Sequence, residues 1–531
     1  MNRLFTTIIN SLRSILYMFK QARVDQRTAS FIVHNRKVWK DYANDKAESE
    51  ILLEVGAMHS AIIAYSYLGN ILSNKYNAKI KAYVLMKQGR VERYLSPSVK
   101  VFKSFNTQEI LYLRLTQPQL KERDRLFNEV YPTLKTKKDV ENLQVEGLWI
   151  GDLVYDSYLK DYMVPTVDIN DSNFHESLRH SLGIYVFWRD YFDSHDVKAV
   201  NVSHCVYNNA IILRLAIQRG IAAYQINATH AYYLTEKNLW AYDDFYYFPE
   251  EFCKLSPEEQ RSGLLEAEKR LARRFAGEVG VDMSYSTKSA YVRKGNCRVL
   301  QKSLRLKVFV ALHCFFDSPH SYGVNLFPDF FEWLTFLGEI SEKTDYDWYL
   351  KTHPDYRSGN VEIIEGFIRK YPKFTLLPSD TSHHQIIEDG IEFALTVYGT
   401  IGFEYAVLGV PVINASLCNP HIAYNFNIHP RTVEEYENIL MNLHNQKMDI
   451  DVNEVYEYYY LGFINNTENW LFNDYRAFLD EIGGYMNQFT PLAYSIFLRE
   501  FSEQKNERII RSLNSFIESK DYCFRNKHAS P

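Results

Sequence analysis

Residues 346–360, YDWYLKTHPDYRSGN, and residues 391–415, IEFALTVYGTIGFEYAVLGVPVINA, decide the fold of this chain. Short apolar runs, such as 348–350 and 410–413, alternate here with longer amphipathic segments. That alternation predicts a parallel α/β sheet whose strands are connected by helices. Polar residues follow the predicted strands, at the edge where sheets of this kind bind their ligands.

The composition of the chain excludes several broad classes of protein. With 531 residues the chain is too long for a single core, so we expect more than one domain. The formal net charge of -5 argues against nucleic acid as the main partner. The six cysteines are widely spaced and form no Cys-x-x-Cys pair. We therefore predict no metal site and no disulfide framework, and we expect reduced thiols in the cytoplasm.

The first 23 residues combine apolar residues at helical spacing with positive charge. The apolar positions include Phe5, Leu12 and Phe19, and the first acidic residue is Asp25. This pattern is typical of a helix that lies in a membrane interface, which would place the protein peripherally on the inner face of the cell membrane. A helix docked on the protein's own core has the same pattern, and the sequence leaves both interpretations open.

Five segments are expected along the chain, because composition and periodicity change at their boundaries. In order they are a helical N-terminal extension (1–48), an N-terminal Rossmann-like domain (49–285), a linker (286–305), a C-terminal Rossmann-like domain (306–430) and a helical segment that packs back on the core (431–531).

The N-terminal domain begins with a predicted strand at 51–55, a helix and a second strand at 80–85, which together make one βαβ unit. No Gly-x-Gly-x-x-Gly motif is present, so a dinucleotide cofactor is not expected. Residues 107–130 are predicted to be one long amphipathic stretch. Residues 256–259 carry the signature of a capped helix start, and that helix is expected to run to about Phe275.

Three residues of the N-terminal domain are candidates for acid–base catalysis. A strand is predicted to end at Gly151, so Asp152 would begin a helix and Asp156 would lie one turn later on the same face. Two carboxylates stacked at the edge of the sheet could supply a general base, although Asp152 taken alone fits a helix cap, which is common chemistry for Asp. His204 follows the predicted strand 199–203 and is the third candidate. His59, which follows the first strand, is a candidate for lining the cleft.

The C-terminal domain opens with a buried strand at 306–312, which is followed directly by polar residues. His313, Asp317 and His320 are predicted to line the cleft and to face the substrate. Metal binding was the alternative, but their spacing matches no standard site, so we predict no metal.

Two further clusters suit the binding of phosphate. Lys351, His353 and Pro354 follow the strand that ends at residue 350, and a cation beside an imidazole can hold a phosphate while a bond to it breaks. Thr400 and Gly402 begin a helix whose free N–H groups favour an anion. Glu404 lies one turn into that helix. A carboxylate would repel phosphate, so its expected partner is a pair of ribose hydroxyls.

These residues also carry a resemblance to known proteins. The spacing of Glu404, Gly409, Pro411 and Val412 resembles the donor-nucleotide segment of GT-B glycosyltransferases. The element Lys351-x-His353-Pro354 resembles the His-Pro element of capsule polysaccharide biosynthesis proteins, which include Kdo- and sialyltransferase-like enzymes that use CMP-sugars. The segments at 151–156, 203–207 and 313–320 are similar to parts of the same bacterial family. Tyr405 departs from the GT-B pattern, which has a small residue there, and this puts the ribose assignment of Glu404 in doubt.

The resemblance implies a GT-B-like α/β fold, with two Rossmann-like domains that face each other across a cleft. The donor would bind the C-terminal domain and a glycan or glycolipid acceptor the N-terminal one. It further implies a metal-independent glycosyltransferase of bacterial surface polysaccharide synthesis (capsule or O-antigen type), which needs no cofactor besides its co-substrate, a nucleotide-sugar and preferably a CMP-sugar. Two alternatives stay open, a CDP-polyol phosphotransferase of cell-surface polymer synthesis and a non-catalytic scaffold of a polysaccharide assembly complex.

Overall fold

The computed structural model of the chain describes residues 24–44, 46–84, 97–283, 286–293, 295, 297–352, 359–465, 468–525 and 528. These residues form two compact units, each built around a sheet that is wholly or mainly parallel. Unit 1 comprises the described residues of Met1–Glu129, Arg179–Ala241 and Thr467–Pro531, and unit 2 those of Val130–Leu178 and Tyr242–Asn466. The expected fold class, an α/β chain with two Rossmann-like sheets, is confirmed.

The sheet of unit 1 has the strand order β3-β2-β1-β6-β7-β8. Its strands are β1 (Glu50–Glu54), β2 (Lys79–Val84), β3 (Thr107–Tyr112), β6 (Val197–Val202), β7 (Ala222–Ile226) and β8 (Ala231–Leu234). All neighbouring strands are parallel except the pair β7 and β8. The chain proceeds from β1 outward through β2 to β3 and later resumes on the other side of β1 with β6. The point where the direction of winding changes therefore lies between β1 and β6.

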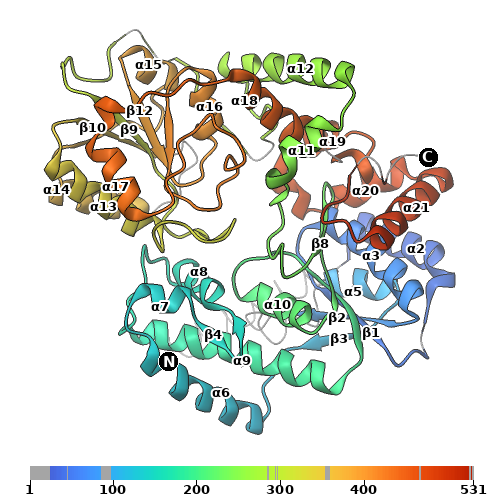
Figure 1. Cartoon of the computed structure of the whole chain (residues 1–531). Helices are drawn as coiled ribbons and strands as arrows, with labels where there is room; N and C mark the ends of the chain where they lie inside the picture. The colour runs from blue at the N-terminus through green and yellow to red at the C-terminus, as the bar shows by residue number, and fades with distance from the viewer. Residues whose placement is uncertain are drawn as a thin grey trace, which may run out of the picture. The chain divides into compact units, whose positions relative to one another are not determined.

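Helices from both ends of the described chain cover one face of this sheet. The helices of unit 1 are α2 (Gln26–Val38), α3 (His59–Tyr76), α5 (Pro97–Ser104), α6 (Gln117–Val130), α10 (Ile211–Gln218), α19 (Tyr475–Ile482), α20 (Leu492–Glu500) and α21 (Glu503–Ser519). Phe31 of α2 stacks on Tyr494 of α20 with ring centroids 4.3 Å apart, and both belong to the core that contains α3. Figure 1 shows α2 and α3 in blue beside α20 and α21 in red. The C-terminal helices thus complete the core that the N-terminal strands begin.

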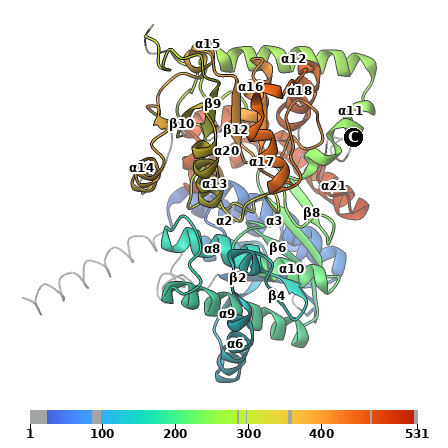
Figure 2. The same ribbon diagram turned by 60° about the vertical axis from the view of Figure 1, so that its left-hand side comes forward.

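The sheet of unit 2 is parallel throughout, with the order β11-β10-β9-β12-β13. Its strands are β9 (Lys307–Ala311), β10 (Asp347–Lys351), β11 (Phe374–Leu376), β12 (Phe393–Thr396) and β13 (Val412–Asn414). The winding changes direction between β9 and β12. One core lies between the sheet and α13 (Phe330–Lys343), α14 (Asn360–Lys370) and α17 (Val433–Met441); α15 (His383–Glu388) and α16 (Ile401–Val407) cover the other face (Figure 2).

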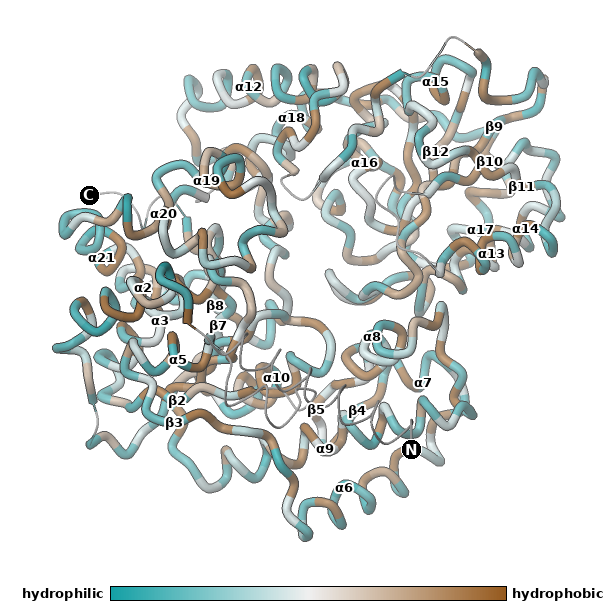
Figure 3. Tube along the Cα trace, turned by 180° about the vertical axis from the view of Figure 1, so that it is seen from behind, coloured by the Kyte–Doolittle hydropathy of each residue, from teal (hydrophilic) through white to brown (hydrophobic). Residues whose placement is uncertain are grey.

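The remaining elements of unit 2 lie outside this sheet. They are α7 (Lys137–Glu141), the antiparallel hairpin β4 (Gln144–Val145) and β5 (Leu148–Trp149), α8 (Gly151–Tyr162), α11 (Phe248–Cys253), α12 (Pro257–Phe275) and α18 (Val452–Tyr459). Helix α9 (Ser172–Ser194) runs from unit 2 into unit 1. In Figure 3 brown, apolar residues gather along the strands, whereas the outer helices α6 and α12 alternate between teal and brown. That contrast reflects strands buried on both faces and helices buried on one.

Several predicted elements match the structure and two do not. Helix α12 begins at Pro257 with the predicted capping box between Ser256 and Glu259, and it ends at Phe275. The stretch 107–130 is wrong as one amphipathic element, because it splits into edge strand β3 and helix α6. An edge strand is half exposed, so β3 lacks the apolar run of a central strand. The strand predicted before Asp152 is the two-residue β5, which pairs only with β4 and is not part of a parallel sheet.

The compact units also divide the chain differently from the predicted domain ranges. Residues 130–178 and 242–283 were expected in the N-terminal domain, yet they belong to unit 2. Side-chain bonds explain this placement: Asp156 is bonded to His320, and Arg274 to Glu404. The expected linker packs on the same unit, since the His383 N–H donates to the Ala290 carbonyl. The described part of 431–531 is shared, with residues up to 465 in unit 2 and the rest in unit 1.

The helices of the described ranges include none that is both long enough and apolar enough to cross a membrane. The predicted interfacial helix at residues 1–23 lies outside the described residues.

Candidate functional site

The carboxyl ends of β9 and β12 meet where the winding of the second sheet changes direction. His313 follows β9, and its Nε2 lies 3.0 Å from Thr396 Oγ1 at the end of β12. The Val397 N–H donates to the same nitrogen at 3.3 Å, and the Gly399 N–H donates to Thr396 Oγ1 at 3.1 Å. The His313 imidazole therefore links the turn that follows β12 to the end of β9. In open α/β sheets this is the position where ligands bind.

The hydrogen bonds determine the protonation of His313. Its Nε2 accepts from a backbone N–H, so the ring proton resides on Nδ1. Burial lowers the pKa of His313 to about 4, which keeps the ring neutral at pH 7. Phe330 stacks on the ring, with centroids 4.5 Å apart. His313 is thus a fixed, neutral donor and not a cation.

Glycine at 399 is required by this arrangement. A Cβ at Gly399 would lie 2.8 Å from Thr396 Oγ1 and would displace the hydroxyl that links the turn to His313. Thr400, which follows, is half-buried and precedes the seven-residue helix α16, which no side chain caps within the described residues. The predicted phosphate position at Thr400 thus lies at the carboxyl edge of the sheet, as expected.

Gly402 has a structural reason for its identity. A Cβ there would lie 2.4 Å from the ring of the buried His421. The glycine lets the helix approach that imidazole closely, which accounts for it without a ligand.

The loop after β9 is held by a buried cluster of charges. His320 Nδ1 lies 2.6 Å from Asp156 Oδ1, and its Nε2 lies 3.0 Å from Glu141 Oε1. Ser318 Oγ donates to Asp156 Oδ2 at 2.5 Å, and Lys138 forms an ion pair with Glu141. Burial alone would lower the pKa of His320, but Asp156 and Glu141 outweigh burial and raise that pKa to about 10. His320 is therefore an imidazolium between two carboxylates.

This cluster changes the interpretation of the two predicted catalytic carboxylates. Asp156 is only 1% exposed, and both of its oxygens accept bonds from the β9 loop. Asp152 is equally buried. Their helix α8 starts after the β4–β5 hairpin and not at a parallel-sheet edge, so the geometric reason for a base at this position is absent. Asp156 fits a structural role, which is to fix the loop that carries His313, Asp317 and His320.

The three polar residues of the β9 loop have different surroundings. Asp317 is exposed, His313 is half-buried and His320 is fully buried. The Tyr398 hydroxyl donates to the Ser318 carbonyl at 2.8 Å, which ties the loop to the turn after β12. Of the predicted cleft-lining residues in this loop, Asp317 is therefore exposed and His313 partly exposed, whereas His320 does not reach the surface.

Lys351 lies at the end of β10, as predicted, but its side chain is buried. Its Nζ lies 3.3 Å from His383 Nε2, and His383 Nδ1 lies 2.8 Å from the Tyr405 hydroxyl. Burial lowers the pKa of Lys351 to about 8. The amine therefore stays mostly charged at neutral pH, but the side chain is only 3% exposed, so the charge contributes through its field. His353 and Pro354 lie outside the described residues.

Glu404 has protein partners in place of the predicted ribose. Arg274 donates to Glu404 Oε1 from both Nε and Nη2, and the Tyr291 hydroxyl donates to Oε2 at 2.7 Å. The carboxylate is 4% exposed. These contacts favour a structural role, in which Glu404 joins α12 and the segment around Tyr291 to α16.

Two candidates belong to unit 1. His204 follows β6 and is exposed. His59 opens α3 and stacks on Tyr494, with ring centroids 4.7 Å apart and an interplanar angle of 6°. Burial lowers the pKa of His59. His59 is thus part of the packing against α20, whereas His204 is accessible.

Sequence reasoning missed His383, Arg274 and Glu54. His383 sits in a Ser-His-His run that carries no motif, and Arg274 is one of several charges on α12. Glu54 lies within the strand predicted at 51–55, and it is buried at the end of β1. The sequence signal for Glu54 was a charged residue inside an apolar strand. Such a carboxylate is expected to be buried and therefore to have hydrogen-bond partners.

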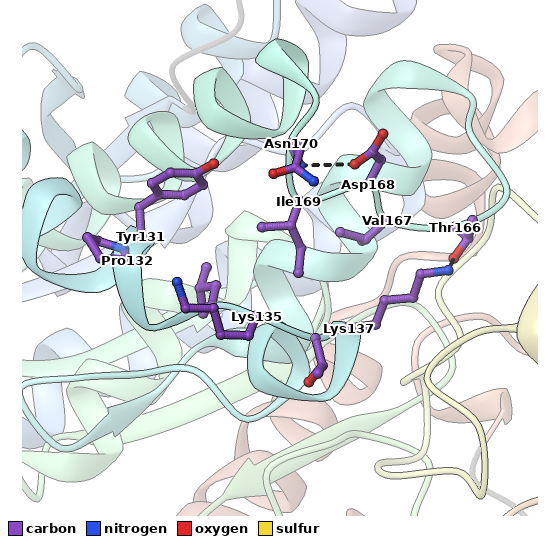
Figure 4. A pocket seen from close by; sticks show the side chains of 11 residues that line it. Tyr131, Pro132, Lys135, Lys137, Thr166, Val167, Asp168, Ile169 and Asn170 are labelled. Atoms are coloured by element: carbon purple, nitrogen blue, oxygen red, sulfur yellow. Dashed lines mark hydrogen bonds between the residues drawn. The ribbon is translucent and has the colours of Figure 1, made fainter.

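A cavity of about 660 Å³ lies elsewhere in unit 2. Figure 4 shows residues 131–137 facing residues 166–170 across it, with the Lys137 amine bonded to Thr166 Oγ1 at 2.6 Å. Asn170 donates its N–H to Asp168 within the same wall. None of its lining residues belongs to a strand of the second sheet. In the described part of the chain, no three His, Cys, Asp or Glu side chains are arranged to hold a metal ion.

Comparison with known proteins places the chain in no family. No family model matches it, and neither does any curated protein. KpsC of Thermosulfurimonas dismutans, a beta Kdo 2,4 transferase, matches 50% of this chain and 79% of its own, with 11% identity and a TM-score of 0.29. The UDP-GlcNAc 2-epimerase of Neisseria meningitidis matches 79% and 100%, with 10% identity and a TM-score of 0.22. Anabaena Alr3699/HepE matches 88% and 99%, with 10% identity and a TM-score of 0.23. These TM-scores are too low for the likeness to assign a fold, a family or an activity.

Proposed function

We propose that this protein is a glycosyltransferase that uses a nucleotide-activated sugar, with a CMP-sugar as the favoured donor, to build a bacterial surface polysaccharide. The observation that carries the proposal is the His313 link between β9 and β12. It builds a rigid, partly exposed polar edge at the point where α/β sheets bind nucleotides. The preference for a CMP-sugar rests on the resemblance of the Lys351-x-His353-Pro354 element.

Unit 2 would bind the donor. The turn after β12 carries the half-buried Thr400, whose hydroxyl can donate to a phosphate, and His313 holds that turn against the end of β9. The charge on buried Lys351 adds a positive field near the end of β10. These groups suit the phosphate of a nucleotide, whose negative charge grows as the bond to the sugar breaks.

The proposed reaction joins two substrates in one displacement. The acceptor oxygen forms a bond to the anomeric carbon and loses its proton to a base. The bond from that carbon to the phosphate oxygen breaks, and its electron pair leaves with the nucleotide. Among the predicted bases, His204 is favoured, because it is exposed whereas Asp152 and Asp156 are buried. The acceptor would be a glycan or a glycolipid that binds unit 1.

A panel of nucleotides tests the donor assignment. CMP, CDP, UDP, GDP and dTDP are added in turn, and the thermal midpoint of the protein is measured. A nucleotide present at 100 times its Kd stabilises the folded protein by about 2.7 kcal/mol, and we expect CMP to shift the midpoint most. If none of the five nucleotides raises the midpoint, the proposed function is wrong.

A pair of histidine variants locates the site. His313→Ala should abolish the shift produced by the best nucleotide, because the turn after β12 loses its anchor. His444→Ala is the matched control, since His444 packs on Tyr346 just before β10, at the opposite end of the strands. An equal shift in the two variants would place the nucleotide elsewhere.

A further inference from the structure

The sheet of unit 1 also has an edge where side chains hold a loop in place, and the proposed donor site does not include it. Strands β1 and β6 are neighbours, with Leu53 opposite Asn201, and the winding of this sheet changes direction between them. Glu54 is the last residue of β1, and residues 203–209, the loop that follows β6, include the first two residues of the 3-10 turn Asn208–Ala210. By its place in the sheet, this loop corresponds to the ligand-binding edge of an open α/β fold.

Glu54 clamps both ends of the loop. Its carboxylate accepts from the Ser203 N–H at 2.8 Å, from Ser203 Oγ at 2.7 Å and from Asn209 Nδ2 at 3.1 Å. The side chain is 3% exposed. Burial raises the pKa of Glu54, although the three donors oppose that rise. A buried carboxyl that bonds the first and last residues of a loop holds the loop in one shape.

Two further bonds anchor the middle of the loop. Cys205 Sγ lies 3.0 Å from Gln225 Oε1 on β7, and Ser181 Oγ of α9 donates to Asn208 Oδ1 at 2.7 Å. Both bonds are buried. The loop is thus fixed to β1, β7 and α9 at once, and within residues 203–209 only His204 is classed as exposed.

The backbone of Tyr207 is strained. Its φ of 61° and ψ of -176° fall in a region that side chains other than glycine rarely adopt. Such a conformation costs free energy and persists only where the surroundings enforce it, and strained residues of this kind cluster at active sites. The four bonded positions around Tyr207 provide that enforcement. A loop that served only to connect β6 with α10 would gain nothing from the strain.

We propose that residues 203–209 form a preorganised acceptor-activating loop, in which His204 takes the proton of the acceptor hydroxyl and Glu54 is the positioning residue that holds the loop in shape. The identity of the reaction rests on the proposed function. The hydrogen bonds by which Glu54 holds the loop do not depend on it. The rigid loop holds the His204 imidazole in one position, so that no ordering of the loop is needed when the acceptor binds.

Hydrogen exchange tests the clamp without any substrate. Glu54→Gln replaces one acceptor oxygen by a donor. Ser203→Ala removes only one hydroxyl, so it can be measured instead if Glu54→Gln folds poorly. Losing such bonds should speed amide exchange of a peptide covering residues 203–209 by about three- to tenfold. Asn77→Gly, at the C-cap of α3, is the control and should leave that peptide unchanged. Unchanged exchange in both clamp variants would overturn the proposal.

Paired glycine and alanine variants test the strain. Both Tyr207→Gly and Tyr207→Ala remove the side chain, but only glycine relieves the backbone, so Tyr207→Gly should have the higher thermal midpoint. At Glu507, an exposed position inside α21, the order should reverse, because glycine weakens a helix relative to alanine. If alanine is the more stable at Tyr207 as well, Tyr207 is not strained and the preorganised loop is wrong.

Kinetics test the chemical role of the loop. CMP-Kdo and CMP-N-acetylneuraminic acid serve as donor probes, with lactose and a Kdo-terminated glycolipid as acceptor probes. Glu54→Ala should lower kcat on the order of 100-fold without changing the KM of the donor. Glu54→Gln should recover part of that loss, because its oxygen still accepts from Ser203. A merely structural residue would not produce this recovery.

The outcomes separate the clamp from the proposed function. If His204→Ala transfers sugar at the wild-type rate, His204 is not the base and this inference is wrong. If the wild-type protein neither binds a nucleotide nor transfers with any probe, the proposed function fails. The exchange and glycine measurements then still decide whether the loop is clamped and strained.

Discussion

Replacing His320 by alanine tests the buried charge cluster most directly. The imidazolium lies between Asp156 and Glu141, with N–O distances of 2.6 and 3.0 Å, and its side chain is 1% exposed. Its removal leaves two carboxylates buried without their shared cation. Breaking a buried ion pair by removing one partner costs about 3–5 kcal/mol, because the remaining charge has lost its compensation.

The pKa of His320 predicts how this stabilisation depends on pH. Asp156 and Glu141 raise that pKa from 6.5 to about 10, so the protonated ring stabilises the folded protein. Because the folded pKa is the higher one, this stabilisation is complete below pH 6.5 and is lost as the pH rises towards 10. We therefore expect unit 2 of the wild-type protein to lose stability over that window, and we expect His320→Ala to lack this dependence.

The assay is thermal unfolding followed by calorimetry at pH 6, 8 and 10, with hydrogen exchange of α8 peptides to identify the transition of unit 2. At pH 6 the variant should unfold about 6–20 °C below the wild-type protein, since a destabilisation of 1 kcal/mol lowers the midpoint of a domain this size by about 2–4 °C. His444→Ala should unfold with the wild-type protein. If His320→Ala matches that control at pH 6, His320 is not a buried cation and Asp156 regains its place as a catalytic candidate.

Three further predictions concern the second sheet. Gly402→Ala should destabilise unit 2 by about 1–3 kcal/mol in urea unfolding, because its Cβ would clash with a buried imidazole, whereas Gly366→Ala, with nothing closer than 3.7 Å, should not. Glu404→Gln should lower the thermal midpoint because it breaks the Arg274 ion pair, yet leave nucleotide affinity unchanged; a selective loss of affinity would restore the ribose role. Lys351→Met should lack the contribution of Lys351, which opposes the loss from His320 as the pH rises from 8 to 10.5, so the thermal midpoint of the variant should fall relative to the wild-type protein over that range, since burial lowers the pKa of that lysine.

Much of the fold could be read from local patterns. Strands β9 and β10 are buried on both faces, so they appear in the sequence as nearly continuous apolar runs. The start of α12 was readable because Ser256 and Glu259 cap the helix through bonds between residues three apart. Edge strand β3 was missed because only one of its six residues is buried, which removes the apolar signal.

The candidate site was predictable only in part. The positions of His313 and Thr400 at a sheet edge followed from their place directly after predicted strands. The roles of Asp156 and Glu404 did not, because their partners His320 and Arg274 lie more than a hundred residues away in the sequence. The local sequence around a carboxylate on a helix is the same whether the carboxylate faces a substrate or a buried cation.

The sequence by itself determined the α/β class, the order of most strands and helices, and the position of residues such as His313 and Thr400 after strands of the second sheet, since these depend on periodicity and on neighbours within a few residues. Only the tertiary structure decided which of those residues remain accessible. Asp156 is buried against His320 and Glu404 against Arg274, so neither carboxylate is accessible to a substrate. Glu54 holds residues 203–209 in a conformation in which His204 is exposed. The physical reason is that a buried charge must find its partner in space, and the sequence does not record that distance.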